Sequence, residues 1–355
     1  MPKIRVLVIE DSVTVRKHLC AVLSADQGID VVAEAADGRQ AIELCAELHP
    51  DVVTMDMMMP VMTGLAATEF IMAYCPTPIL VVSSSLNRGE LFKTYDALAA
   101  GALDVLEKPN GDEAGDDWER NLVSMVKLLS RIKVITHLRG RHQALREPAD
   151  TLAPVGHART VGTNRCDVIA IGASTGGPGA IIEVLRGLPS AFAIPILFVL
   201  HISKPFAAAF ADWLDGQSAH RVAYATDGQA VSSAAGRVIM APPDQHMVVK
   251  NGRVRLTDDA ERHSCRPSVD VLFESLAGEF GPSATGCILT GMGHDGAAGL
   301  LALRRAGALT IAQDEATSVV YGMPREAVLL GAAQRVLPLG DIGLALGSLN
   351  GGPGR

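Results

Sequence analysis

Short apolar runs alternate with amphipathic stretches along the first 110 residues. The runs have the length of buried strands, and the stretches between them show the three-to-four-residue spacing of helices. The pattern predicts five strands: Ile4–Ile9, Val31–Ala33, Val52–Met55, Ile79–Val82 and Ala102–Leu106. It predicts four helices between them: Val13–Leu23, Gly38–Leu48, Gly64–Tyr74 and Arg88–Ala99. This alternation indicates an α/β fold with a doubly wound, five-stranded parallel sheet.

The same alternation returns near residue 167 and continues almost to the end of the chain. Strands are predicted at Asp167–Ile171, Ile194–Leu200, Val238–Met240, Cys287–Thr290 and Leu309–Gln313. The segment Gly228–Leu256 is dense in Gly, Val and turn residues, which indicates an antiparallel excursion. We therefore expect a second α/β domain with a mostly parallel sheet.

A segment without sustained periodicity separates these two parts. It contains Pro148, Pro154, Gly156 and Gly162 together with several Arg and His residues, as linkers commonly do. We accordingly expect a first domain over residues 1–125, a linker over 126–164 and a second domain over 165–347.

Polar side chains follow the predicted strands of the first domain at the point where each strand ends. Glu10 and Asp11 follow the first strand, Asp56 the third, Ser83 the fourth and Lys108 the fifth. The carboxyl ends of parallel strands meet at one edge, where such sheets bind ligands. Three carboxylates crowded there need a cation, and Mg²⁺ suits an oxygen-rich site. The sequence predicts Mg²⁺ on Glu10, Asp11 and Asp56, bridging Asp56 to a phosphoryl group beside Lys108 and Ser83.

A serine stands at the end of the first predicted strand of the second domain. Gly172-Ala-Ser174-Thr-Gly176 fits the G-x-S-x-G pattern, in which a strained turn from strand to helix exposes the serine oxygen. Ser174 is thus the candidate nucleophile. A serine hydroxyl is a poor nucleophile near neutral pH, so it needs a base within reach and a third group that orients the base.

His201 follows the next predicted strand and is the candidate base. On position alone four other histidines compete with it: His220, His246, His263 and His294. Asp295 lies between glycines just after the apolar run Cys287–Leu289, and it is the candidate for the orienting acid.

Three known arrangements of a glycine-rich turn do not fit this domain. In α/β-hydrolases the acid precedes the histidine, whereas here it comes last. A dinucleotide-binding short-chain dehydrogenase would want an acid about 20 residues further on and a Tyr-x-x-x-Lys pair. Tyr224 and Tyr321 lack that lysine, and no Gly-Lys-Ser/Thr of a P-loop is present.

The first domain resembles the receiver domain of response regulators over its whole length. The matching motifs are Val-Leu-Val-Ile-Glu-Asp-Ser, Pro-Asp-Val-Val-Thr-Met-Asp56-Met-Met-Met-Pro60, Gly64-Leu65 and Glu107-Lys108-Pro109. The resemblance implies phosphorylation of Asp56 by a histidine kinase. Val105 stands where receivers usually carry an aromatic switch residue, so signalling by an aromatic flip is not expected. Met58 stands where an acidic residue is often found.

The second domain resembles the catalytic domain of chemotaxis protein-glutamate methylesterases, the CheB family, from about Asp167 to Ile342. The matching motifs are Ile-Gly-Ala-Ser-Thr-Gly-Gly-Pro, Ala-Pro-Pro-Asp-Gln-His, Arg-Pro-Ser-Val-Asp, Leu-Thr-Gly-Met-Gly-His-Asp-Gly-Ala and Ile-Ala-Gln-Asp-Glu-Ala-Thr-Ser-Val-Val-Tyr-Gly-Met-Pro-Arg-Glu. The resemblance implies that Ser174 is the nucleophile, His201 the base and Asp295 its orienting residue. It also places Thr175 and Met292 near the oxyanion. After His201 the family usually continues Met-Pro, where this chain has Ile-Ser-Lys-Pro.

The family resemblance implies a phosphorylation-activated serine esterase. Its substrates would be glutamate methyl esters on methyl-accepting chemoreceptors, with methanol released, and receptor glutamines would be deamidated as a second activity. A chemotaxis histidine kinase would be the phosphodonor. Mg²⁺ would serve the receiver, and the esterase would need no cofactor. The alternative is a receiver-controlled binding module that does not catalyse.

Composition narrows the remaining choices. The formal net charge is −8, whereas binding to nucleic acid requires an excess of Lys and Arg. The six cysteines are scattered without zinc-ligand spacing, as in a reducing cytoplasm. No apolar stretch approaches the roughly 18 residues of a membrane span. We expect a cytoplasmic protein that is not inserted in a membrane and does not bind nucleic acid.

Overall fold

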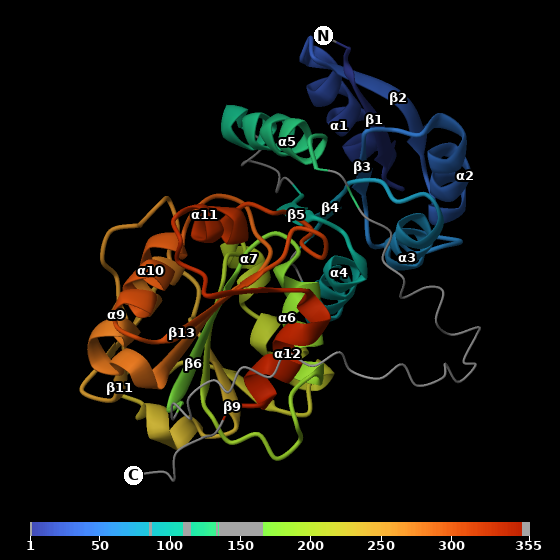
Figure 1. The fold of residues 1–355 in the computed structure, drawn as a ribbon. Coiled ribbons are helices and arrows are strands. Elements are labelled where there is room, and N and C mark those ends of the chain that lie inside the picture. Colours follow the sequence, from blue (N-terminus) through green and yellow to red (C-terminus); the bar gives the residue numbers. More distant parts are fainter. Residues whose placement is uncertain (1, 85–86, 109–114, 133, 135–165, 350–355) are drawn as a thin grey trace, which may run out of the picture.

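The structure is a computed structural model that describes residues 2–84, 87–108, 115–132, 134 and 166–349. Most of the predicted linker, residues 135–164, lies outside the described residues. The two predicted α/β parts are both present and pack against each other (Figure 1).

The first part contains a five-stranded sheet in the order β2-β1-β3-β4-β5, and all its pairs are parallel. Its strands are β1 (Ile4–Ile9), β2 (Ile29–Ala35), β3 (Val52–Met55), β4 (Ile79–Ser83) and β5 (Asp104–Glu107). The predicted sheet is therefore confirmed. Strand β2 is longer than its apolar run because it is an edge strand, which leaves Asp30 and Glu34 exposed to solvent.

Five helices surround this sheet: α1 (Val13–Ala25), α2 (Gly38–Leu48), α3 (Gly64–Tyr74), α4 (Arg88–Ala100) and α5 (Asp116–Leu129). A side chain caps each of the first four by accepting a hydrogen bond from a first-turn amide, which satisfies a donor that the helix itself leaves free. The capping residues are Ser12, Asp37, Thr63 and Asn87.

The second part is built on a seven-stranded sheet in the order β14-β13-β12-β6-β7-β9-β8, again with every pair parallel. Its strands are β6 (Val168–Ala173), β7 (Ile196–Leu200), β8 (Arg221–Tyr224), β9 (Arg237–Met240), β12 (Ala284–Ile288), β13 (Leu309–Gln313) and β14 (Arg335–Leu337). The expected antiparallel pairing is confined to a separate hairpin, β10 (His246–Lys250) with β11 (Arg253–Thr257). Sequence reasoning missed β8 and β14 because both are short, half-exposed edge strands.

Helices cover both faces of this sheet, and two short 3₁₀ turns lie at Val231–Ala234 and Gly281–Ser283. The helices are α6 (Gly177–Arg186), α7 (Lys204–Ala207), α8 (Phe210–Gln217), α9 (Val269–Glu279), α10 (Ala297–Arg305), α11 (Met323–Leu329) and α12 (Leu339–Gly347). Alternate residues of β6 belong to different layers, as strand geometry requires. Ile169 and Ile171 pack in the layer of α6, while Val168 and Ala170 pack in the layer of α9.

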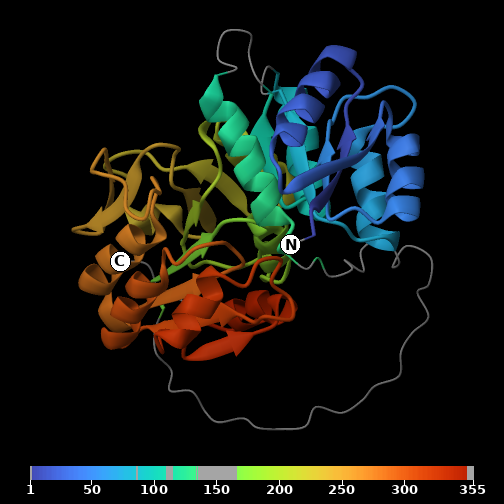
Figure 2. The ribbon, with the colours of Figure 1, turned by 90° about the horizontal axis from the view of Figure 1, so that it is seen from above.

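Helix α4 of the first domain packs against α6 and α8 of the second. The two domains lie side by side (Figures 1 and 2). Tyr95 is fully buried there, with its ring edge-on to Phe210 at 5.3 Å and its hydroxyl donating to the Phe206 carbonyl at 2.6 Å. The indole N–H of Trp213 donates to Asp96 Oδ1 at 2.8 Å. Buried residues of both domains thereby form one continuous apolar core.

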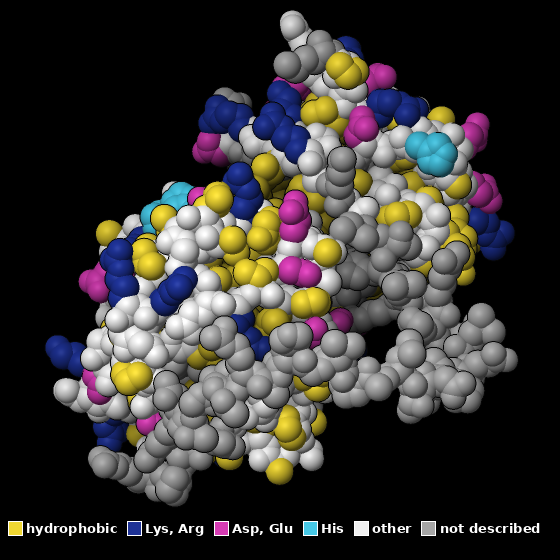
Figure 3. Space-filling model, viewed as in Figure 1, with side chains coloured by type: hydrophobic (Ala, Val, Ile, Leu, Met, Phe, Trp, Pro, Cys, Tyr) yellow, Lys and Arg dark blue, Asp and Glu magenta, His cyan; other side chains and the backbone are white. Residues whose placement is uncertain are grey.

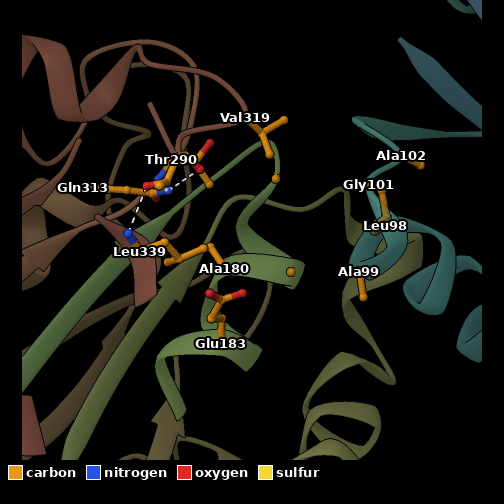
Figure 4. A pocket seen from close by; sticks show the side chains of 13 residues that line it. Leu98, Ala99, Gly101, Ala102, Ala180, Glu183, Thr290, Gln313, Val319 and Leu339 are labelled. Atoms are coloured by element: carbon orange, nitrogen blue, oxygen red, sulfur yellow. Dashed lines mark hydrogen bonds between the residues drawn. The ribbon is translucent and has the colours of Figure 1, made fainter. Parts of the chain in front are cut away.

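A small cavity of about 20 Å³ lies in this contact, between Leu98 and Ala102 of the first domain and Ala180, Val319 and Leu339 of the second (Figure 4). It has room for about one water molecule, so the two surfaces fit closely.

On the outer surface, basic and acidic side chains occur together over the face drawn in Figure 3. Within the described ranges, no helix combines the length and apolar character that crossing a membrane requires.

Candidate active site and phosphoacceptor site

Ser174 lies on a sharp turn between β6 and α6. Gly176 has φ +78°, and a Cβ there would lie 2.6 Å from Val319 Cβ, so only glycine fits this turn. The turn leads directly into α6 and places the serine at the positive end of the helix.

The loop after β12 is held directly against this turn. The amide of Ser174 donates to the Thr290 carbonyl at 3.1 Å, and a Cβ on Gly291 would lie 2.8 Å from Ser174 Cβ. Thr175 is buried, and its carbonyl accepts a hydrogen bond from Thr290 Oγ1 at 3.0 Å. Met292 is half-buried and follows Gly291 in the same loop. Both residues predicted near the oxyanion therefore belong to the segments around Ser174.

His201 follows β7 and reaches the same edge of the sheet. Its amide donates to the Ala173 carbonyl at 3.0 Å, which places it beside the Ser174 turn. Its Nε2 lies 2.9 Å from Asp295 Oδ2. A carboxylate can only accept, so Nε2 donates and Nδ1 is the nitrogen left to exchange a proton with a nucleophile. In this structure Nδ1 faces Cys265 Sγ at 3.8 Å.

Asp295 is buried and fully hydrogen-bonded. Its Oδ1 accepts from Ser268 Oγ at 2.7 Å and from the Asp270 amide at 3.1 Å. Its Oδ2 accepts from the Val269 amide at 2.7 Å in addition to His201. Burial alone would raise the pKa of Asp295, but these hydrogen bonds, led by that from His201, outweigh it and hold the pKa below its ordinary value.

The pKa of His201 is also set by competing effects. Burial lowers this pKa, but hydrogen bonds to Asp295 and Cys265 outweigh burial and raise it to about 9. Both neighbours therefore favour the protonated ring.

The other candidate histidines have different surroundings. His246 Nδ1 accepts from the Ser268 amide at 3.1 Å, and His220 packs edge-on against Phe192. His263 Nε2 lies 3.1 Å from Asp270 Oδ2, and its Nδ1 lies 2.8 Å from His294 Nε2. Among the described hydrogen bonds and ion pairs, only His201 joins a histidine ring to Asp295.

Sequence reasoning missed the residues that hold Asp295 in place. Ser268, Val269 and Asp270 come from the start of α9, far from Asp295 in sequence. Ser268 also caps α9 by accepting from the Val271 amide, and a capping serine carries no sign of a second partner. The motif Arg-Pro-Ser-Val-Asp was the available signal.

A cavity of about 480 Å³ connects Ser174 and His201 with the first domain. Val105 of β5 and Asn121 and Met125 of α5 line it from the receiver side. The candidate active site is therefore walled on one side by the first domain.

The phosphoacceptor candidates meet at the carboxyl edge of the first sheet. Lys108 Nζ lies 2.9 Å from Asp56 Oδ1 and 2.9 Å from Glu10 Oε2. Both acids are almost completely buried, and burial is the main reason that the pKa of each is raised, although Lys108 opposes the shift. Ser83 is buried nearby, and its Oγ accepts from Thr94 Oγ1 of α4 at 3.2 Å.

These acids have the surroundings of a cation site. One carboxylate oxygen each from Glu10, Asp11 and Asp56 lies within 4.8 Å of the others. Asp56 Oδ2 is buried and has no hydrogen-bond partner among the described residues. A hard, oxygen-preferring cation such as Mg²⁺ would satisfy it, so these residues fit the predicted ion.

The two unusual receiver positions are well defined. Val105 is buried and lines the cavity in front of Ser174. Met58 is exposed, while its amide donates to Asp56 Oδ1 at 3.3 Å.

Comparisons with known proteins match both domains of the chain. A model of the CheB methylesterase family matches residues 169–346, half of the chain, and a model of the response regulator receiver domain matches residues 6–115. The chain is 46% identical over 346 residues to a protein-glutamate methylesterase/protein-glutamine glutaminase of Anaeromyxobacter dehalogenans, covering 98% of this chain and 97% of the relative. It is 42% identical over 353 residues to one of Nitrosospira multiformis, covering 98% and 97%.

A solved structure, the CheB methylesterase catalytic domain of Thermotoga maritima, is 35% identical, with a TM-score of 0.49. The match covers 52% of this chain and 98% of that domain. The two family models fall on the two observed domains, and the relatives align along nearly the whole chain. The chain therefore belongs to the CheB methylesterase family, with a response regulator receiver domain preceding the methylesterase domain.

Proposed function

We propose that this protein hydrolyses methyl esters of glutamate side chains on chemoreceptors, with Ser174, His201 and Asp295 as the catalytic residues. The observation that carries this assignment is the meeting of three separate strand ends. The carbonyl of Ala173, just before Ser174, accepts a hydrogen bond from the His201 amide. The Nε2 atom of His201 lies 2.9 Å from Oδ2 of the buried Asp295.

In the first half-reaction, Ser174 Oγ attacks the ester carbonyl while His201 Nδ1 takes the hydroxyl proton. The histidine then returns that proton to the departing methoxide, which leaves as methanol. Asp295 keeps Nε2 protonated and fixes the ring throughout. Backbone amides near Ser174, such as those of Thr175 and Met292, would hold the oxyanion.

In the second half-reaction, water attacks the acyl-enzyme, and His201 again accepts and returns a proton. Glutamate is released and Ser174 is regenerated. A glutamine side chain forms the same acyl-enzyme with ammonia as the leaving group. Deamidation of receptor glutamines is therefore the second activity that we propose for the same residues.

The receiver would control this chemistry through Asp56. A histidine kinase would supply the phosphoryl group, which a carboxylate oxygen of Asp56 receives as the bond from phosphorus to the kinase histidine breaks. Glu10, Asp11 and Asp56 would hold Mg²⁺, which supplies positive charge between the carboxylates and the phosphoryl oxygens. Lys108 and Ser83 are placed to contact those oxygens.

The docked receiver would restrain the esterase before phosphorylation. It forms one wall of the Ser174 cavity, and His201 rests against Cys265 and Asp295. Phosphorylation replaces the single negative charge of the Asp56 carboxylate with roughly two on the phosphoryl group. We propose that this change weakens the contact of α4 with α6 and α8 and opens the cavity. The proposed substrates lie on the cytoplasmic side of receptors, so the enzyme would act in the cytoplasm.

The test is methanol release from methylated receptor membranes by the full-length protein, with and without a small-molecule phosphodonor. Ser174→Ala should lower the rate by at least about 10⁴-fold. Ser233→Ala, an exposed serine remote from the cavity, is the matched control and should remain active. A Ser174→Ala rate within a few-fold of the control would contradict the assignment.

A further inference from the structure

Cys265 lies where the known chemistry has no use for it. Its Sγ is 3.8 Å from His201 Nδ1 and 3.4 Å from the His263 carbonyl. The thiol, a ring nitrogen of His201 and a carboxylate oxygen of Asp295 all lie within 4.8 Å of one another. No disulfide joins Cys265 to any of the other five cysteines. The thiol and the carboxylate thus face the two different nitrogens of the His201 ring, beside the candidate nucleophile.

The donor types decide which ion this group would select. A thiolate is a soft ligand and an imidazole is borderline, and both favour Zn²⁺ or Co²⁺ over Mg²⁺. In a tetrahedral zinc site, bonds of about 2.3 Å to sulfur and about 2.0 Å to nitrogen place those two atoms about 3.6 Å apart. The observed 3.8 Å between Sγ and Nδ1 is close to this separation.

The site is also open to solvent, and the ring of His201 is held in place by Asp295. Ser174, His201 and Cys265 line the same cavity of about 480 Å³, which gives an ion a path from solvent. Asp295 stays on His201 Nε2, the nitrogen that does not face Cys265, and a carboxylate in that position orients a metal-binding imidazole. The four hydrogen bonds to Asp295 hold this support fixed.

We propose that Cys265 Sγ and His201 Nδ1 form a zinc-binding site, supported by Asp295 on Nε2, whose occupation inhibits the esterase. On binding, the Cys265 thiol and His201 Nδ1 release their protons to solvent, and the sulfur and the nitrogen bond to the ion. The lone pair of His201 that would take the Ser174 proton is then committed to the metal. The inhibitory effect rests on the proposed role of His201 as the base, whereas the binding itself does not.

Cobalt provides a readout of binding that is independent of activity. Co²⁺ bound to a thiolate gives an intense charge-transfer absorption in the near ultraviolet. Full-length protein is titrated with Co²⁺ in the presence of Mg²⁺, which occupies the oxygen ligands of the receiver site. We expect the absorption to saturate at one equivalent in the unaltered protein and in Cys20→Ser, a control at another half-buried cysteine. It should be absent in Cys265→Ser.

Zinc inhibition is measured on the same proteins as methanol release, each relative to its own rate with chelator present. The concentration of Zn²⁺ that halves the rate should rise at least tenfold in Cys265→Ser and stay unchanged in Cys20→Ser. Cys265→Asp, which keeps an anionic ligand, should regain part of the sensitivity without the cobalt absorption. Chelator should restore the rate of the unaltered protein.

Two results would overturn the proposal. One is a thiolate–cobalt absorption that persists in Cys265→Ser, and the other is equal zinc inhibition of Cys265→Ser and Cys20→Ser, as expected if His263 and His294 bound the inhibitory ion. These outcomes are separable from the proposed function. Activity in Ser174→Ala would disprove the nucleophile without changing the cobalt spectrum, and loss of the zinc effect would leave the Ser174 assignment intact.

Discussion

Asp56 and Asp295 are both buried at the carboxyl edge of a parallel sheet, yet their surroundings are opposite. Asp295 accepts four hydrogen bonds, and its pKa is held below the ordinary value. Asp56 has one oxygen without a hydrogen-bond partner in the described part of the chain, and burial raises its pKa. A fully satisfied carboxylate keeps its geometry and charge, whereas an under-satisfied one is ready to receive a cation and a new group.

The difference suits the role that we propose for each site. A group that orients a catalytic base works best when it needs no rearrangement during the reaction. A phosphoacceptor has to change, and a buried oxygen without a partner costs about 1–3 kcal/mol until a ligand satisfies it. The receiver thus contains a buried carboxylate oxygen that ligand binding would satisfy, whereas every hydrogen-bonding position described at Asp295 is already filled.

The strongest test of this contrast is Asp295→Asn. The amide cannot accept from all four donors, and its NH₂ group would favour the wrong tautomer of His201. The rate of methanol release should fall by about 10³- to 10⁴-fold. The free energy of unfolding at pH 7, measured with urea, should also fall because a buried donor is left unpaired. A loss of less than tenfold in rate would show that Asp295 does not orient the base.

Asp56→Asn should have the opposite effect on stability. Because the folded pKa of Asp56 is raised, its penalty is absent below the unfolded pKa and grows as pH rises through the folded pKa. The substitution should therefore raise the free energy of unfolding at pH 7 by on the order of 1 kcal/mol and change little near pH 3.

Urea denaturation of both variants across this pH range, without Mg²⁺, makes the comparison direct. Asp295 contributes stability above its unfolded pKa and loses it as pH falls through its lowered folded pKa, so its variant should show the reverse trend. The contrast would fail if both substitutions destabilised the protein equally at pH 7.

The smallest expected effect concerns the structural connection between the Asp56 site and the interface of the two domains. Thr94 donates to Ser83 and directly precedes Tyr95, which anchors the receiver to the second domain. Thr94→Val removes this hydrogen bond with little change in shape. We expect the activation by phosphodonor, as a ratio of rates, to fall about twofold, the effect of a weak hydrogen bond. Thr68→Val is the control, because Thr68 Oγ1 is buried without a described partner. Equal activation of the two variants would remove Thr94 from the coupling.

Strand ends are the part of the molecule that could be predicted from the chain alone. Ser174, His201 and Asp295 each follow an apolar run, and parallel strands bring such positions to one edge. The same reasoning placed Glu10, Asp56 and Lys108 together, and their contacts bear this out.

Other features depend on contacts that leave no local pattern. Ser268 reaches Asp295 across 27 positions of sequence, and Cys265 reaches His201 across 64. Tyr95 reads as an ordinary core position of α4, although its hydroxyl partner is 111 residues away in the other domain. The edge strands β8 and β14 were not predicted because half-exposed strands lack a continuous apolar run.

The shared apolar core around Tyr95 affects how total esterase activity depends on the amount of enzyme in the cell. In the proposed mechanism the receiver and the esterase that it restrains occupy one chain, so docking is an intramolecular equilibrium whose position does not depend on protein concentration. A tether of this kind acts like a partner at roughly millimolar concentration, which a separate receiver domain could not match in a cell. Synthesis of more copies therefore multiplies the restrained and the active forms equally. The fraction of molecules in the docked form therefore stays the same when the protein is diluted or when the cell grows and divides.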